Sequence, residues 1–405
     1  MRKLEWTLVA ALLAVCAGFP IAQAVYELAV EKESPHVLSL FTQSPTKDKL
    51  HRWDENAKDR SIFAKWLRPT TLQLRYDLLG EMSPKALKGA DGWLFYNQDV
   101  DYLLHPPYTD ERFYEGTFDT LIAGKRVNIR NPLVAIKDFR DRLKARGIQL
   151  LLIPIPGKPS IYPEKLVGGF TGQPESPTSR LLDELRKSDI QVVDLFAPLL
   201  KAKAVGDGDL YLKRDTHWTP KGMEVAADAV AKSIRESGIL HEPEGSVSAP
   251  RFTFGDLDVE RWGDIAEMTK VPSRKKIWEM EKVRARQVTD LASGKPYTDD
   301  PKSPILWLGD SYSRIYQTDE PKSAGIIAHV AQRLNCPLAS VVNDGGASTV
   351  VRQQLARKGD LLQGKKLVVW TFVERDLRFG SKGWQIEDLP EPVAEAGSVT
   401  TVEAP

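Results

Sequence analysis

The segment Pro304-Ile-Leu-Trp-Leu-Gly-Asp-Ser311 decides the fold, because an unbroken apolar run ends there in a turn with a reactive side chain. The apolar residues 305–308 predict a short strand buried on both faces, as in a parallel sheet. Gly309 permits a tight turn, and a helix is expected next. A serine at such a turn is exposed, and its backbone N–H can face a developing oxyanion. Asp310 or Ser311 could instead simply N-cap that helix.

Strands and helices alternate on both sides of this segment. Apolar runs predict buried strands over 148–155, 191–196, 338–342 and 365–372. Amphipathic patterns predict helices over 133–145, 179–187 and 220–233, the last beginning after the N-cap Thr219. This alternation predicts an α/β fold whose parallel sheet is covered by helices on both faces.

The N-terminus has the layout of an export sequence. Arg2 and Lys3 precede an apolar run that reaches Ala24, and residues 22–24 have the small-x-small form of a cleavage site. Residues 1–25 are therefore expected to be a cleaved signal peptide or a retained membrane anchor, with neither favoured. Both readings place the bulk of the chain outside the cytoplasm.

Four regions follow the signal or anchor. Residues 26–88 are expected to form a helical extension, in which Trp53, Phe63, Trp66 and Leu67 recur at helical spacing and are expected to be packed. The principal domain is expected over 89–385, opening with an aromatic strand at 93–96. Within it, residues 240–300 are rich in charge, proline and glycine and are interpreted as an excursion outside the sheet. Residues 386–405 have the composition of a disordered tail.

The overall composition argues against several classes of function. The 405 residues include 56 basic and 55 acidic side chains, so no net field selects a polyanion, and nucleic acid is not an expected partner. Of the two cysteines, Cys16 lies in the N-terminal apolar run, so a structural disulfide is not expected. The histidines are scattered and show no zinc-like spacing. We therefore expect neither a metal nor a cofactor.

A second chemical segment, Tyr211-Leu-Lys-Arg-Asp-Thr-His-Trp-Thr-Pro220, lies before a capped helix. In extended backbone, Asp215 and His217 point the same way, so the carboxylate can hold the imidazole in one tautomer. The other ring nitrogen can then accept a serine proton. An Asp-x-His pair is common and by itself is usually structural or metal-related. His217 is nevertheless the only histidine with a carboxylate so placed, whereas His329 falls in an apolar helix and is interpreted as a core residue.

Together these motifs resemble the GDSL/SGNH hydrolase superfamily and, more narrowly, its alginate O-acetyltransferase group. The narrower resemblance rests on Asp-Gly-Trp-Leu-Phe95, on the Lys…Tyr-Pro163 segment, on Asp215-Thr-His-Trp218 preceding the serine, and on Gly345-Gly346 following it. It covers about residues 91–378. The resemblance implies a flavodoxin-like core, and the single-domain, membrane-associated type is favoured because no candidate carbohydrate-binding domain follows residue 380.

The resemblance also implies roles for individual residues. Asp215, His217 and Ser311 would form a Ser-His-Asp triad, with an oxyanion hole formed by backbone N–H groups of Ser311 and of Gly345 or Gly346. Asn343 is a further candidate for that hole. Substrate-binding candidates are Tyr316, Arg314, Arg375, Trp218 and Lys158, and Trp93 and Tyr96 could stack on sugar rings. For Arg314 a surface ion pair is at least as good an explanation, and the aromatic residues could simply be core.

The implied activity is transfer of acetyl groups to hydroxyls of an exported, alginate-like polysaccharide in the periplasm. The implied partners are that polysaccharide, a membrane-bound O-acyltransferase that supplies the acetyl group, and other polymer-export proteins. An acetylesterase would use the same triad with water as acceptor. A non-catalytic polysaccharide-binding subunit is a third possibility, against which the complete triad argues.

Overall fold

The computed structural model describes residues 2–39, 44, 46–106, 109–110, 121–122, 125–126, 131–239, 249–357 and 361–389. The chain divides into two compact units. The first comprises residues 1–83 with 270–277, and the second comprises residues 84–269 with 278–405. The predicted tail falls mostly outside the described residues, and residues 386–389 contain no helix or strand.

The second unit is built on a five-stranded parallel sheet, which confirms the predicted α/β class. The strands are β5 (Gln149–Ile155), β6 (Gln191–Val192), β9 (Ile305–Gly309), β10 (Ala339–Val342) and β11 (Leu367–Val373). They lie in the order β10-β9-β11-β5-β6. Counted from β9 through β10, β11, β5 and β6, this order reads 2-1-3-4-5, which is the flavodoxin-like order. The chain is thus a circular permutation of that fold, in which the strand pair β5 and β6 comes first.

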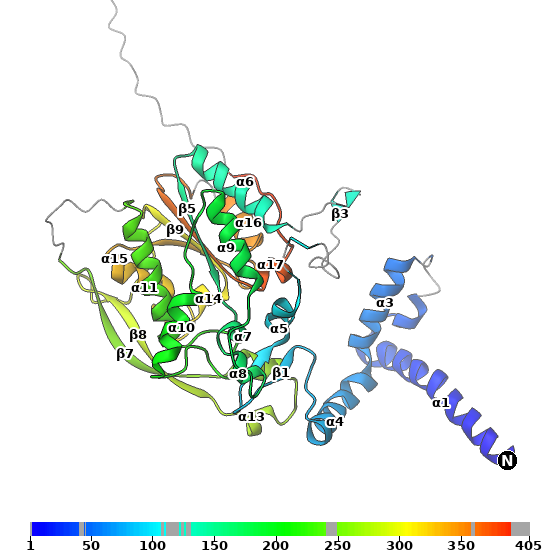
Figure 1. Ribbon diagram of the computed structural model, residues 1–405. Coiled ribbons are helices and arrows are strands. Elements are labelled where there is room, and N and C mark those ends of the chain that lie inside the picture. The colour runs from blue at the N-terminus through cyan, green and yellow to red at the C-terminus, as the bar shows by residue number, and fades with distance from the viewer. Residues whose placement is uncertain are drawn as a thin grey trace, which may run out of the picture. The chain divides into compact units, whose positions relative to one another are not determined.

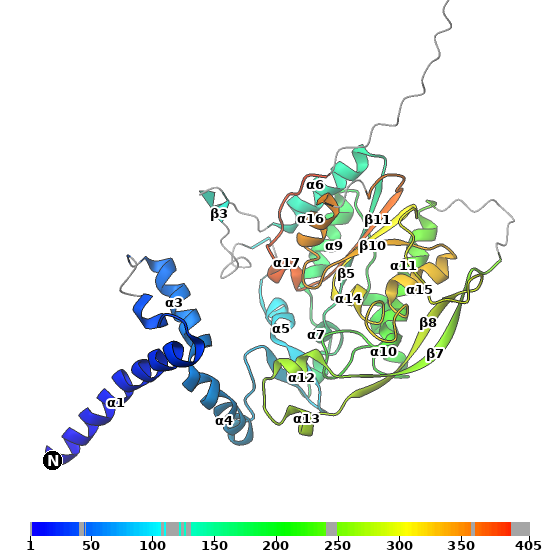
Figure 2. The same cartoon turned by 180° about the vertical axis from the view of Figure 1, so that it is seen from behind.

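Helices cover both faces of this sheet (Figures 1 and 2). One face packs against α6 (Pro132–Ala145), α9 (Pro177–Lys187) and α16 (Val350–Arg357), and the other against α10 (Phe196–Val205), α11 (Pro220–Glu236) and α15 (Ile326–Leu334). In β5, Leu151 and Ile153 belong to one core, whereas Leu150 and Leu152 belong to the other. After the exposed Gln149 the strand is apolar, because successive side chains point to opposite faces and both faces are buried.

Shorter elements surround the sheet. The hairpin of β1 (Ala86–Lys88) and β2 (Leu94–Tyr96) leads into α5 (Asn97–Leu104), and after β5 come α7 (Lys158–Ile161) and α8 (Pro163–Leu166). Outside the sheet, β7 (Phe252–Arg261) and β8 (Glu281–Asp290) form an antiparallel ribbon within the segment interpreted as an excursion. Between them in sequence come α12 (Asp264–Met268) and α13 (Arg274–Ile277), of which α13 belongs to the first unit. The remaining short elements are β3 (Leu121–Ile122), β4 (Lys125–Arg126), α14 (Ser311–Arg314) and α17 (Asp376–Phe379).

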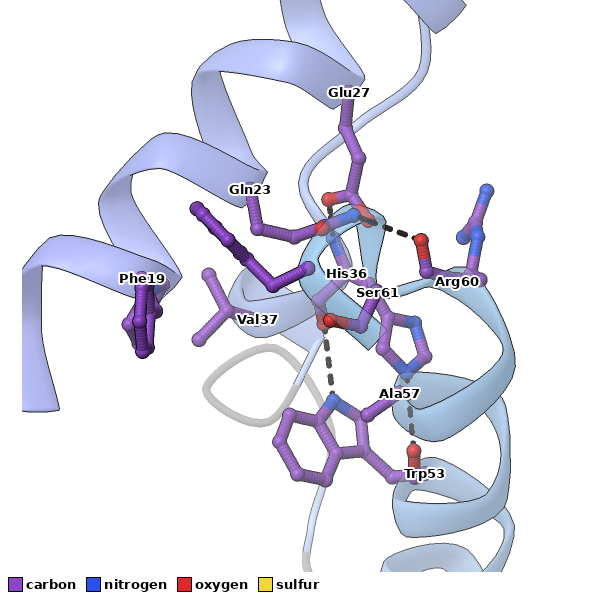
Figure 3. A pocket seen from close by; sticks show the side chains of 11 residues that line it. Phe19, Gln23, Glu27, His36, Val37, Trp53, Ala57, Arg60 and Ser61 are labelled. Atoms are coloured by element: carbon purple, nitrogen blue, oxygen red, sulfur yellow. Dashed lines mark hydrogen bonds between the residues drawn. The ribbon is translucent and has the colours of Figure 1, made fainter. Parts of the chain in front are cut away.

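The first unit consists mainly of α1 (Arg2–Tyr26), α3 (Lys47–Arg60) and α4 (Ile62–Leu79), with π-helical Glu27–Glu31 and 3₁₀-helical His36–Leu38 between α1 and α3. The helical stretch Glu5–Glu31 has a mean hydropathy of 2.2 in its most apolar window and is long enough to cross a membrane, a property that signal sequences share. Figure 3 shows a pocket of about 240 Å³ among these helices, where Glu27 accepts a 2.7 Å hydrogen bond from the His36 amide.

The expected packing of the aromatic residues in this extension holds only in part. Phe63 packs against Phe19, with ring centroids 4.4 Å apart, and Trp53 stacks on His36. Trp66 and Leu67, by contrast, are 76% and 43% exposed. The helical spacing therefore predicted the helix correctly but not which of its residues are covered.

Candidate active site

Strand β9 presents Ser311 at its carboxyl end, where α14 begins. The carboxylate of Asp310 accepts hydrogen bonds from the Tyr312 amide at 2.9 Å and from the Val373 amide of β11 at 3.0 Å. Asp310 is therefore the N-cap, so the capping role does not fall to Ser311. A Cβ atom on Gly309 would lie 2.1 Å from Ser313 Oγ, so only glycine fits at this turn.

Asp215 and His217 lie in a closed loop between Tyr211 and Trp218, which pair through an isolated antiparallel bridge. The amide of Leu212 donates to the carbonyl of His217 at 3.1 Å and closes the loop. Thr219 then caps α11, as the sequence predicted, by accepting a hydrogen bond from the Gly222 amide. The loop geometry is thus fixed by backbone hydrogen bonds at its base.

The three side chains form one hydrogen-bonded row. Ser311 Oγ lies 2.8 Å from His217 Nε2, and His217 Nδ1 lies 2.6 Å from Asp215 Oδ1. Asp215 is 1% and His217 5% exposed, whereas Ser311 is half-buried. Because ionised Asp215 can only accept, Nδ1 carries the proton and leaves Nε2 free to accept the Ser311 proton.

The electrostatics of the row favour proton transfer. Burial raises the pKa of Asp215, but the charge of His217 and the hydrogen bonds to it prevail and hold that pKa well below its usual range. Burial lowers the pKa of His217, but the charge of Asp215 and the hydrogen bond to it prevail and raise that pKa. An imidazole whose charged form is favoured in this way is a stronger base toward the serine hydroxyl.

Two residues of the excursion also reach the row, and no sequence motif pointed to either of them. Asp264 Oδ2 lies 3.7 Å from His217 Nδ1, and Arg261 Nη2 lies 3.8 Å from Asp215 Oδ2. Asp264 is oriented by Thr216, whose amide and hydroxyl donate to its two oxygens at 2.7 and 2.6 Å. The imidazole therefore faces two carboxylates, and the second comes from α12.

The donor atoms of Asp215, His217 and Asp264 lie within 4.8 Å of one another, which would also suit a metal ion. The hydrogen bonds of this structure already use those atoms: Nδ1 bonds Asp215, and both Asp264 oxygens accept from Thr216. Nε2 faces the serine hydroxyl instead. The arrangement is that of a proton-transfer row with a supporting carboxylate.

Three of the predicted substrate-binding residues are buried, and the structure does not support direct substrate contact for them. Trp218, Tyr316 and Lys158 have no exposed surface. The Lys158 ammonium donates to the carbonyls of Asp215 and Leu212 at 2.6 and 2.9 Å, and burial lowers its pKa to about 8. Trp93, 1% exposed, belongs to the core in the same way, because large aromatic surfaces are most stable when buried.

Buried tyrosines also support the loop. The Tyr312 hydroxyl donates to the Thr216 carbonyl at 2.6 Å, and its ring lies 4.8 Å from the His217 ring. The Tyr316 hydroxyl donates to the Trp218 carbonyl at 3.3 Å. These contacts join the segment that begins at Ser311 to the loop that carries His217, so buried hydrogen bonds hold the serine and the histidine close together.

The two arginines predicted to bind substrate are partly exposed. Arg314 is ion-paired with Asp319 and, at 2.7 Å, with Asp344, as its surface interpretation suggested. Arg375 donates to Asp99 at 2.8 Å and packs over the ring of half-buried Tyr96. Burial raises the pKa of Asp310, and the charge of Arg375 opposes that rise, as it opposes the rise in the pKa of His217.

The loop after β10 lies beside Ser311, because the Asn343 amide donates to the Gly309 carbonyl at 3.0 Å. Gly345 in this loop is exposed and has a left-handed φ of 62°. The Gly346 amide already donates to the Asn343 carbonyl at 3.1 Å, so it does not fit the predicted role of oxyanion donor in this conformation. A Cβ atom on Gly346 would lie 2.2 Å from Asn343 Oδ1, which explains the glycine by close packing.

Comparisons with known proteins identify the family of the chain. Residues 86–374 match the family model described as SGNH hydrolase-like domain, acetyltransferase AlgX. The chain is 33% identical over 314 residues to the probable alginate O-acetylase AlgJ of Pseudomonas syringae pv. tomato, covering 75% of this chain and 72% of that protein. It is 28% identical over 321 residues to the Azotobacter vinelandii protein of the same name, covering 75% and 72%.

A solved structure shares the fold. The O-acetyltransferase domain of Pseudomonas putida AlgJ superimposes with a TM-score of 0.54 at 24% identity, covering 72% of this chain and 92% of that chain.

Proposed function

The chain belongs to the family of SGNH hydrolase-like acetyltransferases of the AlgX type, and on that basis we propose that it transfers acetyl groups to hydroxyls of an exported polysaccharide. The observation that carries the proposal is the unbroken row from Ser311 Oγ through His217 to Asp215. The same row supplies a nucleophile, a base and an orienting carboxylate in acyl transfer generally.

In the first half-reaction, Ser311 Oγ attacks the acetyl carbonyl carbon of the donor while His217 Nε2 takes the hydroxyl proton. The tetrahedral intermediate collapses when the bond to the donor's leaving group breaks and His217 returns the proton to that group. Asp215 stabilises the imidazolium throughout. The Ser311 and Gly345 amides are proposed as oxyanion donors, each worth on the order of 3 kcal/mol in the transition state.

In the second half-reaction, a sugar hydroxyl replaces the leaving group. His217 removes its proton as the oxygen attacks the acetyl-serine, and the proton passes back to Ser311 Oγ when the ester is released.

Arg375 over Tyr96 offers a cation and an aromatic ring beside the row, which suits an acidic sugar such as those of alginate. The donor is proposed to reach the site through a membrane-bound O-acyltransferase in the periplasm, alongside other polymer-export proteins.

The test is a product assay on the full chain. The purified protein is incubated with an activated acetyl ester and alginate oligosaccharides, and the products are examined by mass spectrometry. We expect acetylated oligosaccharide from the wild type and from Ser381→Ala, an exposed serine of the same unit, but none from Ser311→Ala. Free acetate without acetylated sugar would identify an esterase instead. Product from Ser311→Ala would overturn the proposal.

A further inference from the structure

Helix α4 carries a row of exposed leucines. Leu67, Leu74 and Leu78 are 43%, 51% and 77% exposed, and their spacing of seven and four residues places them on one face. We call these three residues the leucine stripe. Exposed apolar side chains arranged in a row mark an interaction surface, because isolated ones are normal but contiguous ones are not.

Basic side chains flank the leucine stripe. The helix contains three basic residues, Lys65, Arg68 and Arg75, against one acidic residue, Asp77. Arg68 and Arg75 each follow a stripe leucine directly, so they lie about 100° around the helix from it. Arg75 also pairs with Glu81 at 2.6 Å. A leucine face bordered by arginines is the pattern of a helix that lies along an anionic lipid surface.

The N-terminal end of α4, where the leucine stripe starts, packs against the apolar helix α1. Phe63, one turn before Leu67, lies on the same face of α4 and packs against Phe19 of α1 at 4.4 Å between ring centroids. Gln23 accepts a hydrogen bond from the Ile62 amide at 2.9 Å and donates to the Arg60 carbonyl at 3.3 Å. Figure 3 shows Phe19 and Gln23 projecting from α1 at this junction. The start of α4 is thus fixed beside the C-terminal part of the apolar run.

If α1 spans a bilayer, this junction places the start of α4 at the bilayer surface. The apolar run ends near Ala24, so Gln23 lies where a spanning α1 would leave the hydrocarbon layer. In Figures 1 and 2, α4 leaves this junction in a different direction from α1. The face of α4 that carries Gln73 contacts residues 270–277 of the same unit, because Gln73 accepts a hydrogen bond from the Ser273 amide at 3.0 Å. The leucine stripe lies away from that contact.

We propose that the leucine stripe binds the surface of an anionic lipid bilayer that α1 spans, with Arg68 and Arg75 at the level of the lipid phosphates. Continuity with α1 and the excess of basic side chains identify the occupant as lipid. Burying three leucines adds to the attachment, and the arginines add electrostatic attraction. The proposal is independent of the reaction at Ser311.

Spin labels on opposite faces of α4 test this binding. In a chain with Cys16→Ser and Cys336→Ser, a nitroxide is attached at Leu74→Cys or at Lys65→Cys. These positions are nine residues apart and therefore face opposite ways. Both positions are exposed, so we expect neither substitution to disturb folding. The full chain is reconstituted into vesicles of phosphatidylethanolamine and phosphatidylglycerol, and accessibility to oxygen and to an aqueous nickel complex is measured by electron paramagnetic resonance.

We expect the Leu74 label to be several-fold more accessible to oxygen, relative to nickel, than the Lys65 label. Adding Arg68→Gln and Arg75→Gln should reduce this difference. Equal exposure of the two labels to nickel would overturn the proposal. Protection of the Leu74 label only after a membrane-bound O-acyltransferase is reconstituted with the chain would also overturn it, because the stripe would then be a protein-binding surface.

Discussion

The buried ammonium group of Lys158 donates a 2.6 Å hydrogen bond to the backbone carbonyl of Asp215. The same group donates to Leu212 and Lys213, so one side chain supports the loop that carries the imidazole. A lysine that the sequence suggested as a substrate ligand thereby becomes a positioning residue. Its ammonium group bonds three backbone carbonyls of the loop.

Replacing this lysine separates positioning from binding. Lys158→Met leaves buried carbonyls without donors, and we expect the free energy of unfolding to fall by on the order of 3 kcal/mol. Turnover should fall while KM for the oligosaccharide stays the same, because Lys158 has no exposed surface. Urea denaturation and steady-state kinetics measure both. Lys165→Met, at an exposed ion pair with Asp91, is the control and should change stability by less than about 1 kcal/mol. A higher KM at unchanged stability would show that Lys158 binds substrate.

Asp264 should influence the pH dependence of the reaction. Its negative charge raises the pKa of His217, so the neutral amide in Asp264→Asn should lower that pKa. Because the base must be unprotonated, the acidic limb of the kcat/KM profile should shift to lower pH. Asp258→Asn, at an exposed position in the neighbouring strand β7, should leave the limb in place. A shift toward higher pH, or the same shift in both variants, would contradict the assigned role of Asp264.

Gly309→Ala tests the turn that presents the serine. The new Cβ would lie 2.1 Å from Ser313 Oγ and 2.8 Å from Thr371 Oγ1, so the turn must move. We expect a loss of about 1–3 kcal/mol in stability and a large loss of turnover. Gly255→Ala, where no atom lies within 4 Å of the new Cβ, is the matched control. Similar activity of the two variants would show that the turn tolerates displacement.

His329 makes stability depend on pH. It is fully buried, as the sequence suggested, and donates from Nε2 to the Arg286 carbonyl at 2.8 Å. Burial lowers its pKa from 6.5 to about 3, so the unfolded chain takes up a proton that the folded chain does not. This residue therefore reduces stability progressively as the pH falls from about 7 toward about 3. Urea midpoints at pH 7 and pH 4.5 should differ less for His329→Gln than for the wild type. An equal difference would assign the acid sensitivity to other groups.

The parts of the fold that could be predicted from sequence are those with local causes. Ile305–Gly309 and Leu367–Val373 are strands because continuous apolar runs are buried on both faces. Asp215, His217 and Ser311 were singled out because spacing and turn chemistry are local signals, and the structure brings them together. Asp264 and Arg261 had no such signal, because they reach the row only through the tertiary position of the end of β7 and the start of α12.

The sequence predicted less well which side chains near the site are buried. Trp218 follows His217 directly and Tyr316 lies five residues after Ser311, but nearness in sequence does not decide which side chain faces the solvent. Gly346 is required by close packing against Asn343, whereas sequence suggested a hydrogen-bond donor. In each case the deciding contact comes from a neighbour whose position depends on tertiary structure.

The position of β11 has a consequence for biogenesis. This strand is the last that the structure describes, yet it lies between β9, which Ser311 follows, and β5, which is followed by Lys158 beneath the loop of His217. Within the described sheet, β9 and β5 are joined through β11, so we expect a polypeptide that lacks residues 367–373 to align Ser311 poorly with His217. Loss of β11 is therefore expected to remove activity without any change in a reactive side chain.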